Sequence, residues 1–498
     1  MHDAVLALDQ GTTGSLALVV ARDGSVLGRA YAPLAQSYPE PGWVEHDPEE
    51  IWRISLRVME QALLAAGTGA RGLRAIGITN QRETTVVWDR RSGRPVHPAI
   101  VWQSRQTAPI CESLRRAGHE AALRRRTGLV LDAYFSGTKL RFILDRHPDL
   151  APAAAAGDVV FGTVDTWLLH KLTGGSVHAT DPTNASRTLL YDIHERRFHP
   201  ELLSVLDVPA AMLPEVRPSA GPFGETVACG SLPAGVPISG IAGDQQAALY
   251  GQHCFSPGMA KNTYGTGCFV MMNTGDRAAS SPGGLLTTLC CDERGGVAYA
   301  LEGSVFVAGA AVQWLRDEMG LIRDAAETEA LARSVDDSLG VYVVPAFTGL
   351  GTPWWDMEAR GAILGLTRGA GRAHVVRATL ESLAYQSRDV IEVMNADSGI
   401  ALRELRVDGG AAANDFLMQL QADLLGVPVD RPLLVETTAA GAAFLAGIGA
   451  GFWSGPEELA GARRRERLFE PAMPAAERDR RYQGWKRAVA RVLTRPQS

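Results

Sequence analysis

The chain has 498 residues, of which 46% are hydrophobic and 21% charged, and these proportions exclude wholesale disorder and a coiled coil. At roughly 100–200 residues per domain, this length predicts two to four domains. Forty-nine basic residues against 55 acidic ones give a net charge of −6, so we expect no nucleic-acid partner.

The sequence carries no pattern typical of export or of a zinc site. The opening residues Met1-His2-Asp3-Ala4 lack the basic lead-in of a signal peptide. The longest apolar run, 439–453, is short and rich in glycine, so we expect no membrane span. The six cysteines form no Cys-x-x-Cys pair and His-Glu-x-x-His does not occur, so we predict no zinc. We therefore expect a cytoplasmic protein with reduced cysteines.

The first half of the chain predicts a β-meander followed by alternating strands and helices. Residues 4–9 and 16–21 are apolar strands around a polar turn, and Asp23-Gly24 turns the chain into a third strand near 25–32. Further strands are expected at 75–79, 84–89 and 159–162, and helices near 103–117 and 137–146. The Ala-rich patch 151–157 and the Pro/Gly-rich stretch 213–237 are typical of surface connectors.

A second Gly-Thr hairpin begins about 250 residues later, with strands expected at 259–263 and 268–274. Its recurrence suggests two related halves, and we divide the chain into domains 1–246 and 247–498. The elements expected after it are helix 305–319, strand 341–346, helix 372–396, strand 404–408, helix 411–425, strand 427–430 and helix 437–451. Alternating strands and helices predict an α/β fold.

Both hairpin turns have the composition of phosphate-binding loops. Residues 9–14 read Asp-Gln-Gly-Thr-Thr-Gly and residues 262–267 read Asn-Thr-Tyr-Gly-Thr-Gly. Glycine allows close backbone approach, and turn N–H groups with Thr hydroxyls form an anion site. Asp9, at a strand end, could hold Mg²⁺ through water. Either turn alone could be an ordinary hairpin, but two facing turns could clamp a triphosphate, and no Lys follows a Gly to form a Walker-type loop.

Two pairs of residues four apart could form the rest of a nucleotide site. Gly410 and Asn414 follow the expected strand 404–408, where glycines leave a flat surface for a base. Gly309 and Gln313 form a similar pair on the expected helix 305–319. The alternative for both pairs is ordinary helix packing by small residues.

A polar loop and an aspartate before a helix could bind and activate a polyol. Asp244 precedes an apolar helix expected from Ala247, where it is either a helix cap or a general base for phosphoryl transfer. Residues 79–84 join two expected strands, and Arg82 beside Glu83 offers both donors and acceptors to neighbouring hydroxyls; a solvated loop is the alternative. Aromatic residues that could supply an apolar wall, or simply fill the core, are Trp102, Tyr134 and Phe269.

Long stretches of the chain resemble the FGGY carbohydrate kinase family, from about residue 4 to residue 485. The matching segments are 7–13, 41–48, 77–85, 134–139, 162–167, 183–187, 238–246, 260–269, 344–351, 361–369 and 406–410. The segment Gln81-Arg82-Glu83-Thr84-Thr85 in particular points to the members that act on glycerol rather than on a sugar.

This resemblance implies two actin/hexokinase-like (ribonuclease H-like) domains flanking a deep cleft, and ATP- and Mg²⁺-dependent phosphorylation of glycerol to sn-glycerol 3-phosphate in glycerol catabolism. It implies that Asp244 is the base and Asp9 organises the metal, and we expect a homo-oligomer, a dimer or a tetramer. The glycerol-binding residues would be Arg82, Glu83, Trp102, Tyr134, Asp244, Gln245 and Phe269. The residues binding ATP or ADP would be Thr12, Thr13, Gly14, Thr266, Gly309, Gln313, Gly410 and Asn414.

The chain departs from the family pattern at two places. Many glycerol-specific members carry Ser-Ser-Arg where this chain has Gly14-Ser15-Leu16, so an arginine that would reach the phosphates is missing. The loop 230–236 lacks the arginine with which some members bind fructose 1,6-bisphosphate. Two alternatives stay open: a sibling kinase for a pentulose or another polyol, and a non-catalytic, actin-like nucleotide-binding scaffold, for which a polar substrate set would have no use.

Overall fold

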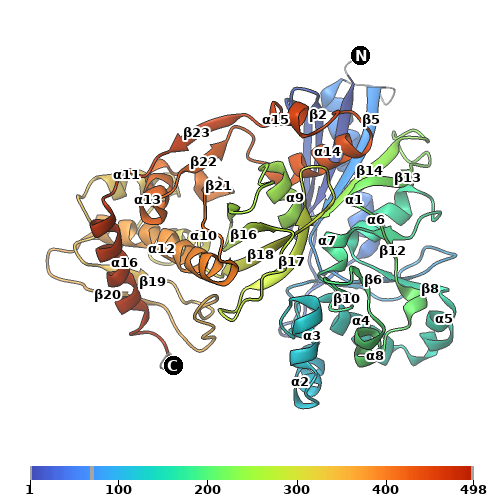
Figure 1. Ribbon diagram of the computed structural model, residues 1–498, viewed down its shortest axis with the longest axis horizontal. Coiled ribbons are helices and arrows are strands. Elements are labelled where there is room, and N and C mark those ends of the chain that lie inside the picture. Colours follow the sequence, from blue (N-terminus) through green and yellow to red (C-terminus); the bar gives the residue numbers. More distant parts are fainter. Residues whose placement is uncertain (1–2, 68–71, 495–498) are drawn as a thin grey trace.

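Two large β-sheets and the helices around them make up the protein (Figure 1). The structure is a computed structural model that describes residues 3–67 and 72–494. Strands from the start of the chain form one sheet, and the C-terminal end of the described chain lies beyond the other. Over the described ranges, no helix is both long and apolar enough to cross a membrane.

The first sheet has six strands, with the start of the chain near its centre. In sheet order these are β13 (Ala220–Glu225), β14 (Pro237–Gly243), β5 (Leu73–Asn80), β1 (Ala4–Gln10), β2 (Gly14–Ala21) and β3 (Val26–Pro33). β2 is antiparallel to β1 and β3, whereas β5 runs parallel to β1 and to β14. Gln10 pairs with Ser15, so the predicted tight turn between the first two strands is confirmed.

The second sheet has seven strands and repeats this topology. In sheet order these are β17 (Leu286–Cys291), β18 (Val297–Val305), β16 (Cys268–Gly275), β15 (Met259–Tyr264), β21 (Glu404–Asp408), β22 (Val429–Pro432) and β23 (Arg465–Phe469). The run β18-β16-β15 is antiparallel and continues into β21 and β22 in parallel, as β3-β2-β1 continues into β5 and β14. The second predicted hairpin and the α/β class are therefore confirmed.

Helices bury both faces of the first sheet. Leu6 and Leu8 of β1 pack with helix α1 (Pro48–Ala66), while Val5 and Ala7, on the other face, pack with helix α14 (Thr437–Gly449). Helix α14 comes from the far end of the chain, and in Figure 1 it lies against the blue strands of the first sheet. Helix α9 (Asp244–Gly251) contacts α14 and strands of both sheets.

The crossing of α9 and α14 depends on a glycine. A Cβ at Gly441 would lie 1.8 Å from the carbonyl oxygen of Ala247, so any larger residue would push the two helices apart. Because α9 begins with Asp244, this close contact also fixes the position of the predicted base. The division of the chain between residues 246 and 247 stays a prediction.

The segment between β5 and β14 forms a smaller layer beside the first sheet. Its main strands, β6 (Val86–Asp89) and β8 (Val159–Gly162), pair antiparallel. Its helices are α2 (Ala108–Arg116), α3 (Glu120–Thr127), α4 (Ser136–Arg146), α5 (Ala151–Ala156), α6 (Val164–Leu172), α7 (Pro182–Ala185) and α8 (Pro200–Leu206). Its short strands are β7 (Ala99–Ile100), β9 (Ala179–Thr180), β10 (Tyr191–Asp192), β11 (Arg197–Phe198) and β12 (Glu215–Val216). Strand β4 (Glu45–His46), which precedes β5 in the chain, pairs with β7.

The second sheet carries the helices α10 (Gly309–Asp317), α11 (Glu327–Arg333), α12 (Arg372–Ser398), α13 (Asp415–Leu425) and α16 (Ala475–Val489). The short helix α15 (Pro456–Ala460) instead packs with the core of the first sheet through Leu459. A two-stranded ribbon of β19 (Tyr342–Val344) and β20 (Ala362–Leu364) lies against α12.

Two predicted connectors are regular elements. The patch 151–157 is helix α5, because alanine has a high helix propensity and Gly157 ends the helix in the left-handed conformation, with φ 78°. The stretch 213–237 contains strand β13, which is at the edge of its sheet and pairs only with β14, so it tolerates proline and glycine. The first prediction was wrong, and the second was wrong for residues 215–216 and 220–225, whereas residues 226–236 do connect β13 to β14.

Three predicted helices start at other residues. The helix expected at 305–319 begins at Gly309, because Val305 still belongs to β18. The helix expected from 411 begins at Asp415, because the side chain of Asn414 accepts the backbone N–H of Leu417 and residues 410–413 form a 3₁₀ turn. The helix expected from Ala247 begins at Asp244, which is its first residue and not its cap.

Candidate active site

One cavity brings together the nucleotide residues predicted in the second half of the chain. Its volume is about 500 Å³. It lies at the second hairpin turn, between the N-terminal end of α10 and the turn after β21. The predicted residues lining it are Thr266, Gly309, Gln313, Gly410 and Asn414. A second cavity, of about 510 Å³, contains none of the predicted site residues.

The cavity has a flat wall where the chain leaves β21. A Cβ built at Gly410 would meet no heavy atom within 4 Å, so this glycine faces open space. Gly309 lies at the turn itself, and its N–H donates to the carbonyl oxygen of Gly265 at 3.0 Å. The amide of Asn414 donates to Thr328 at 3.1 Å and holds α11 against this wall. Sequence patterns missed Thr328 and Arg316, which also line the cavity from neighbouring helices.

The first hairpin presents Thr12, Thr13 and Gly14 beside Tyr31 of β3. A Cβ at Gly14 would lie 2.5 Å from the hydroxyl oxygen of Tyr31, which in turn donates to the carbonyl oxygen of Thr13 at 3.4 Å. Leu16 is paired with Tyr31 across the two strands. Tyr31 therefore occupies the space that a side chain at Gly14 would need. Its ring fits the glycine found here, where many members of the family carry serine.

The polar loop after β5 is buried, so the solvated-loop alternative was wrong. Arg82 is 2% exposed and Glu83 1% exposed. Glu83 has a φ of 61°, uncommon for a residue other than glycine. The loop carbonyl of Glu83 accepts the hydroxyl of Ser136 at 2.9 Å. A buried loop with a strained residue and two ionisable side chains is costly to build, which is typical of a functional site.

The first turn of α9 lies directly opposite this loop. Nε of Arg82 is 3.1 Å from Oδ1 of Asp244, whose carboxylate also accepts the N–H of Gln245 at 2.7 Å. The side-chain oxygen of Gln245 accepts a hydrogen bond from Nζ of Lys261, a fully buried lysine on β15. Lys261 also donates to Thr263 at 2.9 Å. The four predicted polar residues for the polyol thus converge from two elements, the loop after β5 and the first turn of α9, and Lys261 joins them from β15.

Two of the three predicted aromatic residues lie together. The rings of Trp102 and Tyr134 make an edge contact with centroids 5.4 Å apart. Nε1 of Trp102 donates to the hydroxyl of Thr12 at 2.8 Å, which connects this aromatic pair to the first hairpin. Phe269, on β16, pairs with Thr263 and with Ser304 in the second sheet. No contact between Phe269 and the other two rings occurs within the described residues.

The charges around Asp9 suit a cation. Asp9 lies at the end of β1, where burial and the neighbouring carboxylate of Asp244 raise the pKa of Asp9 to about 7. Two carboxylates that disfavour each other's negative charge are stabilised when a divalent cation binds between or beside them. The oxygen donors also match the preference of Mg²⁺. The residues present therefore fit the predicted metal.

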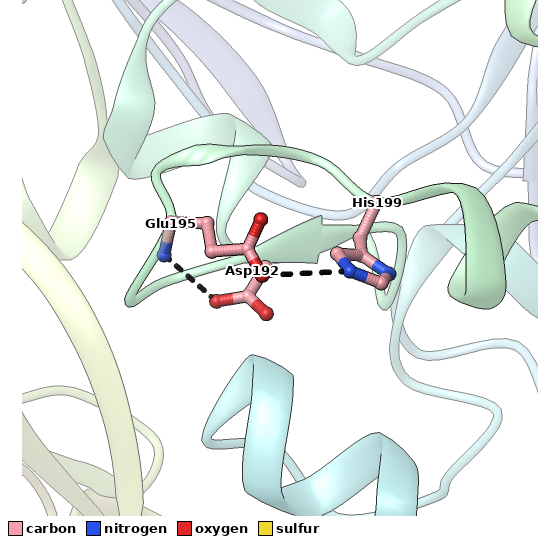
Figure 2. A group of neighbouring side chains, drawn as sticks. All are labelled: Asp192, Glu195 and His199. Carbon is pink, nitrogen blue, oxygen red and sulfur yellow. Dashed lines mark hydrogen bonds and ion pairs between the residues drawn. The ribbon is translucent and has the colours of Figure 1, made fainter.

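A second group of possible metal ligands lies away from this site. Asp192, Glu195 and His199 come close together around the β10–β11 turn (Figure 2). Arg126 is already paired there, with Nη1 3.0 Å from Asp192 and 3.6 Å from Glu195. Nδ1 of His199 accepts the N–H of Glu201 at the start of α8. The group is an ion-pair cluster that fixes a turn.

Sequence patterns missed the two residues that pair with the polar loop. Glu302 of β18 and Arg187, just after α7, are 1% and 0% exposed and both contact Arg82 or Glu83. Arg187 falls in the segment 183–187 that matches the family pattern, which was a usable signal. Glu302 lies in a strand that no expected element covered.

The repeated sheet topology and the buried charged site define a kinase of the FGGY class. Residues 4–251 match the N-terminal domain of the FGGY family of carbohydrate kinases, and residues 260–450 match its C-terminal domain. The chain belongs to this family.

Particular relatives are similar over nearly the whole chain. The glycerol kinase of Symbiobacterium thermophilum is 59% identical over 488 residues, and glycerol kinase 2 of Thermotoga maritima is 57% identical over 489; the match covers 98% of each chain. A crystal structure of Plasmodium falciparum glycerol kinase with ADP has a TM-score of 0.94 at 33% identity, covering 99% of both chains. The predicted fold class, with two actin/hexokinase-like domains, is confirmed.

Proposed function

We propose that this protein transfers the γ-phosphoryl group of ATP to glycerol and releases sn-glycerol 3-phosphate and ADP. The observation that carries the proposal is the convergence of Arg82, Glu83 and Asp244 in one buried site. The similar full-length proteins named glycerol kinases support it. We further propose a cytoplasmic, homo-oligomeric enzyme of glycerol catabolism, a dimer or a tetramer.

Glycerol binds through paired donors and acceptors. Arg82 and the amide of Gln245 donate to its hydroxyl oxygens, while Glu83 and Asp244 accept hydrogen bonds from its hydroxyl groups, because an ionised carboxylate has acceptors and no donor. Oε2 of Glu83 makes no hydrogen bond within the described parts of the chain, and is therefore available to a ligand. The aromatic residues Trp102, Tyr134 and Phe269 cover the C–H groups.

Asp244 is the general base of the transfer. As the glycerol oxygen attacks the γ-phosphorus, the O–H proton passes to the Asp244 carboxylate, the new O–P bond forms, and the bond to the β–γ bridging oxygen breaks. Phosphoryl transfer demands little more than positioning and charge stabilisation, so an aspartate in contact with the hydroxyl suffices. Its position on the first turn of α9 points it at the same site as Arg82.

The nucleotide binds in the cavity at the second hairpin. The base lies against Gly410, between Asn414 and Gln313, while Thr266 and Gly309 approach the phosphates from one side and Thr12, Thr13 and Gly14 from the other. Asp9 holds Mg²⁺, which when bound offsets the negative charge of the phosphates. Strand β15 connects the two sites, because Lys261 and Thr263 face the polyol and Thr266 follows three residues later in the turn.

A coupled assay for ADP release tests the proposal. We expect release only when glycerol, ATP and Mg²⁺ are all present, and a higher kcat/KM for glycerol than for xylulose, gluconate or erythritol. Faster turnover of one of those three would establish a sibling kinase instead. Nucleotide binding without any phosphorylation of the four substrates would favour a non-catalytic scaffold.

A further inference from the structure

Two arginines and two glutamates form a closed cluster beneath the proposed glycerol site. Arg82 and Arg187 supply the positive charges, Glu83 and Glu302 the negative ones, and each side chain is at most 2% exposed. The formal charges of these four side chains balance, and the partly exposed Asp244 approaches Arg82 from outside the cluster. Burying a single charge is very costly, whereas a neutral hydrogen-bonded set is tolerated, so removing one member leaves its partners uncompensated.

Glu302 is the centre of this cluster. Its Oε2 lies 2.5 Å from Nη1 of Arg82, and its Oε1 lies 3.1 Å from Nη2 of Arg82 and 3.1 Å from Nη2 of Arg187. Burial raises the pKa of Glu302, but the guanidinium groups of Arg187 and Arg82 outweigh it and hold this pKa at about 2. One carboxylate therefore binds Arg82 in a two-pronged, planar contact and also fixes Arg187.

Arg187 transmits this contact to Glu83. Its Nε donates to Oε1 of Glu83 at 2.6 Å, and its guanidinium lies 5.6 Å from the ring centroid of Tyr134 and 5.2 Å from that of Phe135. Nη1 of Arg187 is buried and has no hydrogen-bond partner among the residues the structure describes. The orientation of Arg187 thus depends on its two glutamates and the aromatic rings around it.

The members of the cluster come from distant parts of the fold. Arg82 and Glu83 follow β5 of the first sheet, and Arg187 belongs to the layer beside it, but Glu302 lies within β18 of the second sheet. Glu302 is paired there with Met271 and Leu286, so its backbone is fixed in the sheet. Glu302 thus ties the substrate loop to the second sheet through its contacts with two arginines.

We propose that Glu302 and Arg187 are positioning residues for glycerol: Glu302 neutralises and orients Arg82, and Arg187 turns Glu83 so that its second carboxylate oxygen faces the substrate. The proposal rests on the proposed function. Without Glu302, Arg82 would be drawn to its remaining acids, Glu83 and Asp244, which lie 3.8 Å and 3.1 Å from its Nε. Those are the groups that glycerol needs as acceptors.

The test compares Glu302→Gln and Arg187→Lys with the wild-type full chain, measuring KM for glycerol, KM for ATP and kcat. We expect each variant to raise the glycerol KM by about tenfold or more, the effect of losing a charge-assisted hydrogen bond, and to leave the ATP KM within about twofold. Arg187→Lys keeps the charge but cannot bridge both glutamates with one planar fork. It serves as the second variant if Glu302→Gln does not fold.

The matched control is Asp430→Asn. Asp430 is fully buried and also holds two arginines, Arg463 at 2.8 Å and Arg465 at 2.7 Å, but it contacts none of the proposed glycerol residues. We expect its thermal stability to fall while both KM values stay within about twofold of wild type. An equal rise of the glycerol KM in this control would show a general effect of lost charge and would overturn the proposal.

Two further outcomes separate the proposals. If the wild type phosphorylates glycerol and both Glu302→Gln and Arg187→Lys keep its glycerol KM, the positioning role is wrong and the proposed function stands. If the wild type releases no ADP with glycerol, both are wrong. In the double variant Glu302→Gln/Arg187→Gln, which restores the charge balance of the cluster, the fold-change in glycerol KM should be smaller than the product of the fold-changes in Glu302→Gln and in Arg187→Gln, each measured singly.

Discussion

Nε of Arg82 lies 3.1 Å from Oδ1 of Asp244, so the loop after β5 and the first turn of α9 meet through one ion pair. Asp244 is 29% exposed at this contact, whereas Arg82 is almost completely buried. The carboxylate can therefore reach a ligand while the guanidinium behind it stays fixed. This asymmetry leads to different expectations for the two residues.

Replacing Asp244 by Asn should abolish transfer while glycerol binding changes by no more than about tenfold. The amide keeps the shape and part of the hydrogen bonding but cannot take the proton, and loss of a general base costs roughly 10²–10⁴ in rate. Steady-state turnover and glycerol titration measure the two effects. Asp145→Asn, at an exposed aspartate paired with Arg141, is the control and should behave as wild type. Near-normal turnover of folded Asp244→Asn would rule out its role as base.

Replacing Arg82 or Glu83 by Ala should raise the glycerol KM far more than the ATP KM. Each change removes charge-assisted hydrogen bonds worth about 1.5–3 kcal/mol, or roughly 10–150-fold. Arg141→Ala, which removes a half-buried arginine of α4 that contacts none of the proposed site residues, should change neither constant. If both loop variants fold and bind glycerol like the wild type, the substrate pocket lies elsewhere.

The two neighbouring glycines after β21 should respond differently to substitution. Gly410→Val should fold normally but raise the ATP KM by tenfold or more, because its side chain projects into open space in the cavity, where a ligand would collide with it. Gly409→Val should instead lower the melting temperature, because Gly409 has a φ of 85° and a Cβ there would lie 2.4 Å from the carbonyl oxygen of Tyr264.

Kinetics for ATP and glycerol, together with thermal unfolding, distinguish these two glycines. An unchanged ATP KM in Gly410→Val would mean that the nucleotide does not use this wall. The glycerol KM should stay the same in that variant, since Gly410 contacts the proposed nucleotide cavity alone.

Lys261→Met should raise the glycerol KM by roughly 3–10-fold, the effect of one or two weakened hydrogen bonds. Lys261 has only donors, so it holds the side-chain oxygen of Gln245 and leaves the amide hydrogens for a glycerol hydroxyl. Burial lowers the pKa of Lys261, because a charged ammonium is costly inside the protein, and the apolar replacement removes that cost. Lys171→Met, which breaks a surface pair with Glu49 at 2.8 Å, is the matched control and should leave kinetics unchanged. Unaltered glycerol kinetics in Lys261→Met would contradict this role.

Sequence patterns predicted those parts of the site that depend on short-range order. Each hairpin has glycines and threonines between two apolar runs, and such a turn is determined within about ten residues. The residues predicted at Gly309, Gln313, Gly410 and Asn414 line one cavity, although two of the predicted helix starts were wrong. The spacing of residues within a turn or a helix start was therefore enough to predict these four cavity residues.

Long-range partners could not be predicted in this way. Arg82 and Glu302 are 220 residues apart in sequence, and Arg187 and Glu83 are 104 apart. Their pairing depends on how the two sheets pack, and no local pattern of apolar and polar residues records that. The same limit explains why Tyr31 was missed, since its contact with Gly14 depends on the register of β2 and β3.

The loop of residues 230–236 should not bind fructose 1,6-bisphosphate. It contains no arginine, and a carboxylate already occupies one of its backbone donors: Oε1 of Glu60 accepts the N–H of Ser231 at 2.7 Å. A Cβ at Gly230 would lie 1.9 Å from the same oxygen, so Glu60 is packed closely against the loop. A phosphate would meet this negative charge and find few donors, whereas phosphate sites usually present several cationic or backbone groups.

We therefore expect millimolar fructose 1,6-bisphosphate to leave the rate unchanged at fixed ATP and glycerol. Glu60→Gln should be equally insensitive, because removing the repulsion adds no cation. An arginine at position 235 would be a poor way to create the site, since Gly235 has a φ of 84° that strains any other residue. Placing the arginine at Ser231 avoids a left-handed position and, combined with Glu60→Gln, should give measurable inhibition if loop charge is what decides binding. Half-inhibition of the wild type below millimolar concentration would show that another surface binds the bisphosphate.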